Sequence, residues 1–128
     1  MISIVIPTYN NLEYLKLCID SINKNSKYTH EIKLHINDGS DGTLQFAKNN
    51  NIFFTHSKKN IGLCSAINKV SSTVNNKYIL YAHDDMYFCP GWDVSLLNEV
   101  KEIKHDKFFL SGTLIAVSYT HLTLPTKV

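Results

Sequence analysis

The chain has 128 residues, of which 44% are hydrophobic, 11% aromatic and 19% charged. This composition is typical of one ordinary domain with enough apolar side chains for a core, and it excludes a disordered chain, a collagen-like repeat and a disulfide scaffold. No run of roughly 18 apolar residues occurs that could span a membrane. The first ten residues lack the pattern of a signal peptide, so we expect a cytoplasmic protein.

The chain is close to neutral, and all of its basic residues apart from His are lysines. Thirteen Lys and no Arg stand against 11 acidic residues, and the net charge of +2 does not favour nucleic-acid binding. Without Arg, the bidentate guanidinium grip on phosphate is missing. A bound phosphate would have to be held by Lys, by backbone N–H groups at helix starts or by a metal ion.

Cysteine and histidine show no metal-ligand spacing. We expect the three cysteines to be reduced and to lie in or near the core: Cys18, Cys64 and Cys89. Three histidines are expected on the surface: His30, His56 and His105. A fourth, His35, is expected on the polar side of a strand.

The first part of the chain alternates between strand and helix patterns. Residues 2–6 form a continuous apolar, β-branched run that predicts a buried strand stopped by Pro7. Asn10 or Asn11 caps the next helix, in which apolar side chains recur at helical spacing. Its apolar positions are Leu12, Leu15, Ile19 and Ile22. Strict alternation over 32–36 then predicts a second strand.

The same alternation continues to about residue 110. Helices are expected at 43–48, from about 62 to 70, and at 92–103. Further strands are expected at 52–55, at 78–82 and beginning at 108–110. This order predicts βαβ units, hence an α/β fold with a mostly parallel sheet and helices on its faces. Residues 116–128 have no clear period and resemble a translated cloning adaptor, so we expect a non-native or disordered tail.

Three polar clusters directly follow predicted strands, at residues 9–10, 37–43 and 83–85. In parallel sheets, ligands bind in the crevice outside the carboxyl ends of the strands. Asp84 and Asp85 are adjacent carboxylates after a buried strand, which favours Mg²⁺ or Mn²⁺ bridged to a phosphate. The alternative is a solvated loop in which one of the two carboxylates caps a turn.

Two glycine-containing segments are further candidates. Gly39 and Gly42 allow close approach of a ligand beside Asp38, whose carboxylate can accept hydrogen bonds from a base or ribose. The alternative is a tight turn in which Asp41 or Thr43 caps the next helix. The segment at 60–63 brings a glycine to a helix start, where N–H groups can bind an anion or simply begin the helix.

Familiar nucleotide and hydrolase motifs are missing. The sequence contains no G-x-G-x-x-G after the first strand, no G-x-x-x-x-G-K-[ST] and no G-x-S-x-G. A nicotinamide-dependent dehydrogenase, a P-loop NTPase and an α/β-hydrolase are therefore disfavoured.

Four segments together resemble the N-terminal half of a family 2 glycosyltransferase with the Rossmann-like GT-A fold. They are SIVIPTYN at 3–10, NDGSDGT at 37–43, NIGLCSAIN at 60–68 and YILYAHDDMYFCPGW at 78–92. The first is similar to the family's opening strand, and the second to its D-D-G-S-x-D-G-T, one residue shorter. The third matches N-x-G-x-x-x-A-x-N, and the fourth is similar to the D-x-D strand followed by P-G-W, with His83 at the first D-x-D position.

The resemblance implies a role for each matching residue. Pro7, Thr8 and Tyr9 would flank the nucleotide, Asp38 would hydrogen-bond its base, and Asp84 would lie near the ribose or diphosphate. Asn60 and Gly62 would complete the nucleotide site. Asp85 would bind Mn²⁺ or Mg²⁺, with His83 as a second candidate ligand.

The implied reaction is inverting, metal-assisted transfer of a sugar from a nucleotide diphosphate, with UDP favoured, to a hydroxyl of an unknown sugar, lipid or protein acceptor. Residues 1–115 would be the donor-binding part, incomplete at the C-terminus. The catalytic base is expected beyond residue 115, since the last acidic residue is Asp106, and the chain alone is expected to be inactive. The full-length protein would work in the cytoplasm or at the cytoplasmic face of a membrane. The alternatives are a non-catalytic nucleotide-sugar-binding module and, less favoured, a sugar nucleotidylyltransferase.

Overall fold

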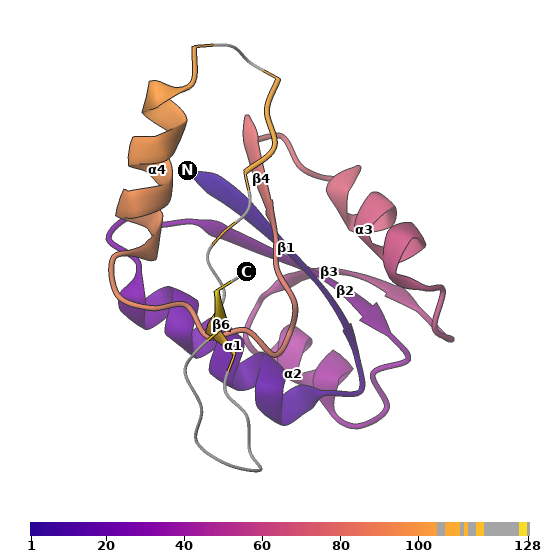
Figure 1. The fold of residues 1–128 in the computed structure, drawn as a ribbon. Helices are drawn as coiled ribbons and strands as arrows, with labels where there is room; N and C mark the ends of the chain where they lie inside the picture. The colour runs from indigo at the N-terminus through magenta and orange to yellow at the C-terminus, as the bar shows by residue number, and fades with distance from the viewer. Residues whose placement is uncertain (105–106, 111, 113–114, 117–125, 128) are drawn as a thin grey trace. The chain divides into compact units, whose positions relative to one another are not determined.

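The computed structural model describes residues 1–104, 107–110, 112, 115–116 and 126–127 (Figure 1). The chain divides into two compact units, Met1–Asp93 and Val94–Val128. The strands are β1 (Ile2–Tyr9), β2 (Glu31–Asn37), β3 (Phe53–Ser57), β4 (Tyr78–Tyr81), β5 (Ile115–Ala116) and β6 (Thr126–Lys127). The helices are α1 (Leu12–Asn25), α2 (Thr43–Asn49), α3 (Leu63–Ser71) and α4 (Trp92–Glu102). None of the described helices is long and apolar enough to cross a membrane.

The first unit is built on a four-stranded sheet of order β3-β2-β1-β4 in which every pairing is parallel. Along β1, Ser3 pairs with Glu31 and Tyr9 pairs with Asn37, so β1 and β2 end at the same level. The α/β class and the parallel sheet predicted from the sequence are confirmed.

The strand order determines where the helices lie. The first two connections step from β1 to β2 to β3, whereas the third returns across the sheet to β4. Because such crossovers are right-handed, α1 and α2 lie on one face of the sheet and α3 on the other (Figure 1). The strand order therefore reverses between β1 and β4, and this is the point at which α/β sheets bind ligands.

The core lies between the sheet and α1, and it uses the apolar positions that the sequence predicts. Its largest fully buried apolar side chains on these elements are Ile4, Ile6, Leu15, Ile22, Leu34 and Ile36. Burying each contributes about 1.5–3 kcal/mol relative to leaving it exposed.

The expectation that Pro7 stops the first strand is wrong, because β1 continues to Tyr9. The carbonyl of Val5 accepts a hydrogen bond from the N–H of Ala82 (3.0 Å), so it points toward β4. In a strand, the backbone N–H and C=O groups of residues two apart point toward the same neighbouring strand. The nitrogen of Pro7 therefore points, like the Val5 carbonyl, toward the side of β4, and β4 has already ended at Tyr81. At that position β1 is locally an edge strand, where a missing N–H is tolerated.

Two histidine expectations are also wrong. His35 is fully buried, because α3 covers the face of the sheet that the alternation marks as polar. The side chain of His30 is 1% exposed and lies 2.9 Å from the carboxylate of Asp93. His56 is partly exposed, and His105 lies outside the described residues. Of the cysteines, Cys18 is buried as expected, but the other two, Cys64 and Cys89, are exposed on the surface.

In the second unit, residues 107–110 are not in a strand, contrary to the expectation, and Phe109 is 95% exposed. A three-residue apolar run predicts a strand only where a neighbouring strand can receive it. Within this unit β5 and β6 pair antiparallel, with Ile115 opposite Lys127. Apart from residues 116, 126 and 127, the segment predicted to be a non-native tail lies outside the described residues.

Candidate functional site

A hollow of about 390 Å³ opens at the carboxyl ends of the strands. It is lined by residues from all three polar clusters, which are far apart in the sequence. Its lining residues are Pro7, Thr8, Tyr9, Asn10, Asn11, Asn37, Asn60, Gly62, Leu63, His83 and Asp84. The predicted nucleotide-binding residues are thus brought together except for Asp38, which is beside the hollow, and the candidate metal ligand Asp85 is likewise not in its lining.

A hydrogen bond joins β1 to the end of β4 at the point where the strand order reverses. The hydroxyl of Thr8, which is 3% exposed, donates to the Asp84 carboxylate at 2.8 Å. One carboxylate oxygen of Asp84 is thereby held against the sheet. The side chain is oriented at the mouth of the crevice before any ligand arrives.

Asp38 is held in the left-handed region of backbone conformation, with φ of 60°. Its carboxylate accepts hydrogen bonds from the Asn10 side chain (3.0 Å) and from the Ser40 N–H (3.2 Å). These bonds, from Asn10 and then from Ser40, hold the pKa of the carboxyl below its ordinary value. The ring of His56 lies 2.7 Å from the Asp38 carbonyl, so the backbone is held as well. Asp38 therefore presents a charged acceptor in a defined position.

Asn37 is a site residue that the sequence argument missed. It is 4% exposed, and its side-chain oxygen accepts from the Ile61 N–H (3.0 Å) and the Ser57 hydroxyl (3.1 Å). It thus holds the loop that carries Asn60 and Gly62 against the end of β2. The available signal was its position, since it directly ends a strand within the polar cluster at 37–43.

Negative charge is concentrated where β4 ends. Burial, and then the charges of Asp84 and Asp85, raise the pKa of the Cys18 thiol to about 12. The pKa of Tyr81 is raised by the same causes, burial first and then the two carboxylates. Two acidic side chains of this kind attract a cation.

The residues around Asp85 fit a cation that is held only partly by protein. The part of the chain that the structure describes contains no group of three or more His, Cys, Asp or Glu side chains placed to hold a metal. Mg²⁺ and Mn²⁺ at nucleotide sites need fewer, because one or two carboxylates suffice when phosphate oxygens and water supply the rest. Asp85 is exposed, and the rings of His83 and Tyr81 lie side by side, with centroids 4.9 Å apart and planes tilted by 60°.

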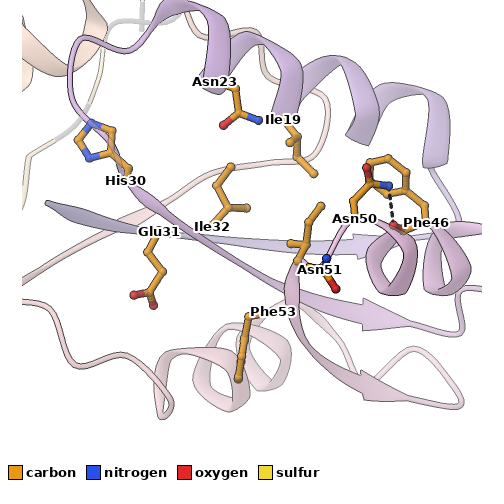
Figure 2. Close-up of a pocket in the computed structure, with 10 residues that line it drawn as sticks. Ile19, Asn23, His30, Glu31, Ile32, Phe46, Asn50, Asn51 and Phe53 are labelled. Atoms are coloured by element: carbon orange, nitrogen blue, oxygen red, sulfur yellow. Dashed lines mark hydrogen bonds between the residues drawn. The ribbon is translucent and has the colours of Figure 1, made fainter.

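A second hollow, of about 440 Å³, lies between α1, α2 and the starts of β2 and β3 (Figure 2). The charged groups along it are already paired. Glu31 lies 3.1 Å from the ammonium of Lys33, and His30 is paired with Asp93. This hollow is at the opposite end of the strands from the polar clusters, so we place the functional site at the first hollow.

Comparison with known proteins identifies the family of the chain. The family model "Glycosyl transferase family 2" matches residues 3–125. The chain belongs to this family. An uncharacterized glycosyltransferase of Rickettsia prowazekii (strain Madrid E) is 33% identical over 92 residues, which are 69% of this chain and 28% of that protein. One of Rickettsia bellii (strain RML369-C) is 31% identical over 94 residues, 69% of this chain and 13% of that protein. The chain therefore spans less than a third of the length of these two relatives.

Solved structures confirm the GT-A fold of this family 2 chain. S. aureus TarS 1–349 superposes with a TM-score of 0.70 at 19% identity, over 79% of this chain and 32% of that one. The same protein was solved in complex with UDP-GlcNAc. The mannosyltransferase PcManGT from Pyrobaculum calidifontis, in complex with GDP-Man and Mn²⁺, superposes with a TM-score of 0.64 at 18% identity, over 81% of this chain and 32% of that one.

Proposed function

We propose that this chain is the donor-binding part of a glycosyltransferase that moves a sugar from a nucleotide diphosphate to an acceptor hydroxyl. The observation that carries the proposal is the Thr8–Asp84 hydrogen bond at the point of strand reversal, with Asp85 directly beside it. In a family 2 chain, this arrangement supports a diphosphate site at the carboxyl ends of β1 and β4.

Each part of the site has a proposed task. Tyr9, which is 52% exposed, and Pro7 and Thr8 flank the nucleotide. Asp38 accepts hydrogen bonds from the base, and Asn60 and Gly62 border the diphosphate. Their loop is held by Asn37 (Ile61 N–H to Asn37 oxygen, 3.0 Å), so these groups need little rearrangement on binding.

Asp85 is the proposed ligand of Mn²⁺ or Mg²⁺, with His83 as a second candidate. When bound, the cation acts as a Lewis acid on the leaving diphosphate. It also supplies positive charge to a phosphate site in a chain that contains no Arg. UDP is the favoured nucleotide because TarS was solved with UDP-GlcNAc and with UDP, and GDP is the comparison because PcManGT was solved with GDP-Man. We further propose that the reaction inverts the anomeric carbon of the sugar and that the catalytic base, which deprotonates the acceptor hydroxyl, comes from beyond residue 115.

Calorimetric titration of the chain with UDP, with and without Mn²⁺, tests this function. We expect Mn²⁺ to strengthen UDP binding by about tenfold, equivalent to about 1.4 kcal/mol. Asp85→Ala should remove most of that increment, because the exposed carboxylate is the proposed ligand. Asp20→Ala is the matched control, since Asp20 is an exposed acidic residue on α1.

The outcomes separate the parts of the proposal. Equal binding with and without Mn²⁺ would refute the cation. Binding of GDP in preference to UDP would correct the nucleotide. Absence of binding to either nucleotide would refute the donor site itself.

A further inference from the structure

The segment that carries Asp84 and Asp85 has no helix or strand of its own. It runs from the end of β4 at Tyr81 to the start of α4 at Trp92. Among the described residues, its last backbone hydrogen bond to the sheet is the one from the Ala82 N–H to the Val5 carbonyl, at 3.0 Å. The following residues are therefore directed by groups elsewhere in the fold: by the Asn25 carbonyl, which accepts from the Gly91 N–H at 3.1 Å, and by several side chains.

Those side chains come from one face of α1. Cys18, Ser21 and Asn25 are three and four residues apart, so they lie in a row along the helix. We call these three residues the α1 polar stripe. The Cys18 thiol donates to the carbonyl of His83 at 3.6 Å, and Asn25 donates to the carbonyl of Phe88 at 2.7 Å.

Ser21 is the centre of the stripe and is fully buried. Its hydroxyl donates to the Cys18 carbonyl at 2.7 Å and accepts from the Phe88 N–H at 2.9 Å. A buried hydroxyl on the core side of a helix destabilises the fold unless it is hydrogen-bonded. Here the bond is made to a loop residue 67 positions away, so the polar side chain has a defined partner.

The stripe holds the segment on both sides of the two carboxylates. Asp84 and Asp85 lie between His83 and Phe88, whose backbone groups bind side chains of the stripe. On the other side, Asp84 is held by Thr8. Asp85 has no such contact to the sheet among the hydrogen bonds of the described residues, so its position depends on the two anchors.

We propose that the α1 polar stripe positions the Asp84–Asp85 pair for the divalent cation and the nucleotide diphosphate. The inference rests on the proposed function, because the cation and the nucleotide are those of the proposed donor site. Ser21 and Asn25 are positioning residues that act through Phe88 without touching the ligand.

Two substitutions with matched controls test the stripe. Asn25→Asp keeps the shape of the side chain but leaves no N–H to donate to the Phe88 carbonyl, and Ser21→Ala removes the acceptor of the Phe88 N–H. Asn23→Asp places the same charge on an exposed position of α1. Ser72→Ala removes a hydroxyl that makes the same i−3 bond, to the Lys69 carbonyl at 2.7 Å, at the exposed C-cap of α3.

We expect both stripe variants to lose most of the roughly tenfold Mn²⁺ increment in UDP affinity while their metal-free affinity for UDP stays within about twofold of the wild type. Amide exchange at Phe88 should become faster in both. The two control variants should behave as the wild type in each measurement. Circular dichroism under the titration conditions establishes that each variant is folded.

Three results would overturn the proposal in different ways. A wild type without Mn²⁺-dependent UDP binding would refute the proposed function and the positioning role with it. A wild-type increment retained in both stripe variants would refute the positioning role alone. An equal loss of UDP affinity with and without Mn²⁺ would show that the stripe merely supports the fold.

Discussion

A single carboxylate, that of Asp41, serves the starts of two helices. One oxygen accepts from the Leu12 N–H at 3.1 Å, at the start of α1. The other accepts from the Thr43 N–H (3.1 Å) and its hydroxyl (2.6 Å), at the start of α2. Neither N-cap residue, Asn11 or Gly42, makes a side-chain cap of its own. Burial raises the Asp41 pKa, but the hydrogen bonds from Thr43 and Leu12 outweigh it, and the pKa lies below its ordinary value.

We predict that Asp41→Ala lowers the free energy of unfolding by about 2 kcal/mol, because two helix caps worth about 1 kcal/mol each are lost. Asp41→Asn should be less damaging, because its side-chain oxygen can still accept one of the bonds. Urea unfolding followed by circular dichroism measures the difference. Asp20→Ala, at an exposed position of α1, is the control and should change little. A loss no larger than that of the control would contradict the double cap.

At the scale of elements, the pattern of apolar and polar residues predicted which segments of the first unit become strands and helices. Leu15, Ile19 and Ile22 are buried as their spacing indicates. The pattern could not predict that α3 would cover the polar face of β2, because burial of that face depends on the third crossover and not on β2 itself. Lys33 and His35 are consequently buried there.

The same limit applies to the candidate site. Clusters that follow strands were predictable, because the carboxyl ends of parallel strands meet at one edge. The hydrogen bonds between clusters, such as Thr8 to Asp84 and Asn37 to Ile61, depend on register and loop conformation. The periodicity of α1 likewise marked its apolar face and gave no sign that Ser21 binds a loop residue.

The polar layer under α3 makes stability depend on pH. His35 lies 2.7 Å from the Thr55 hydroxyl and 3.1 Å from that of Ser57. Burial, and then the charge of Lys69, lower its pKa below the ordinary 6.5. The unfolded chain therefore takes up this proton at higher pH than the folded chain does. The contribution of neutral His35 to the free energy of unfolding is fully present above pH 6.5, and it is lost as the pH falls through the pKa of the folded chain.

We predict that the wild type loses stability between pH 7 and pH 5 and that His35→Gln loses less over the same interval, because glutamine keeps hydrogen-bonding groups but cannot be protonated there. Urea unfolding at several pH values gives, for each protein, the slope of the free energy of unfolding against pH. His83→Gln, at an exposed position, is the control and should keep the wild-type slope. Identical slopes for wild type and His35→Gln would contradict the assignment.

At the scale of the whole first unit, Asp93 is the last residue of the unit, and it is hydrogen-bonded to residues more than 60 positions earlier in the chain. The fully buried carboxylate accepts from the N–H groups of Lys27 (3.1 Å) and Tyr28 (2.9 Å). It also lies 2.9 Å from Nε2 of His30, whose Nδ1 accepts from the Ile2 N–H at 3.2 Å. Because Nδ1 accepts, Nε2 carries the proton and donates to Asp93. The network closes the start of β1, the α1–β2 loop and the start of α4 onto one another.

This network should make the fold sensitive to acid. Burial raises the pKa of Asp93, but the hydrogen bonds from Tyr28, His30 and Lys27 outweigh it and lower the pKa from 3.8 to about 2. A carboxyl whose pKa is lower in the folded chain stabilises the fold above the unfolded value, and this stabilisation is lost as the pH falls from about 4 to about 2. The shift corresponds to about 2 kcal/mol. We therefore expect the wild type to lose about 2 kcal/mol more than Asp93→Asn over that interval in urea unfolding, with Asp20→Asn retaining the wild-type loss. If Asp93→Asn were as acid-sensitive as the wild type, the carboxylate would not be the group that titrates.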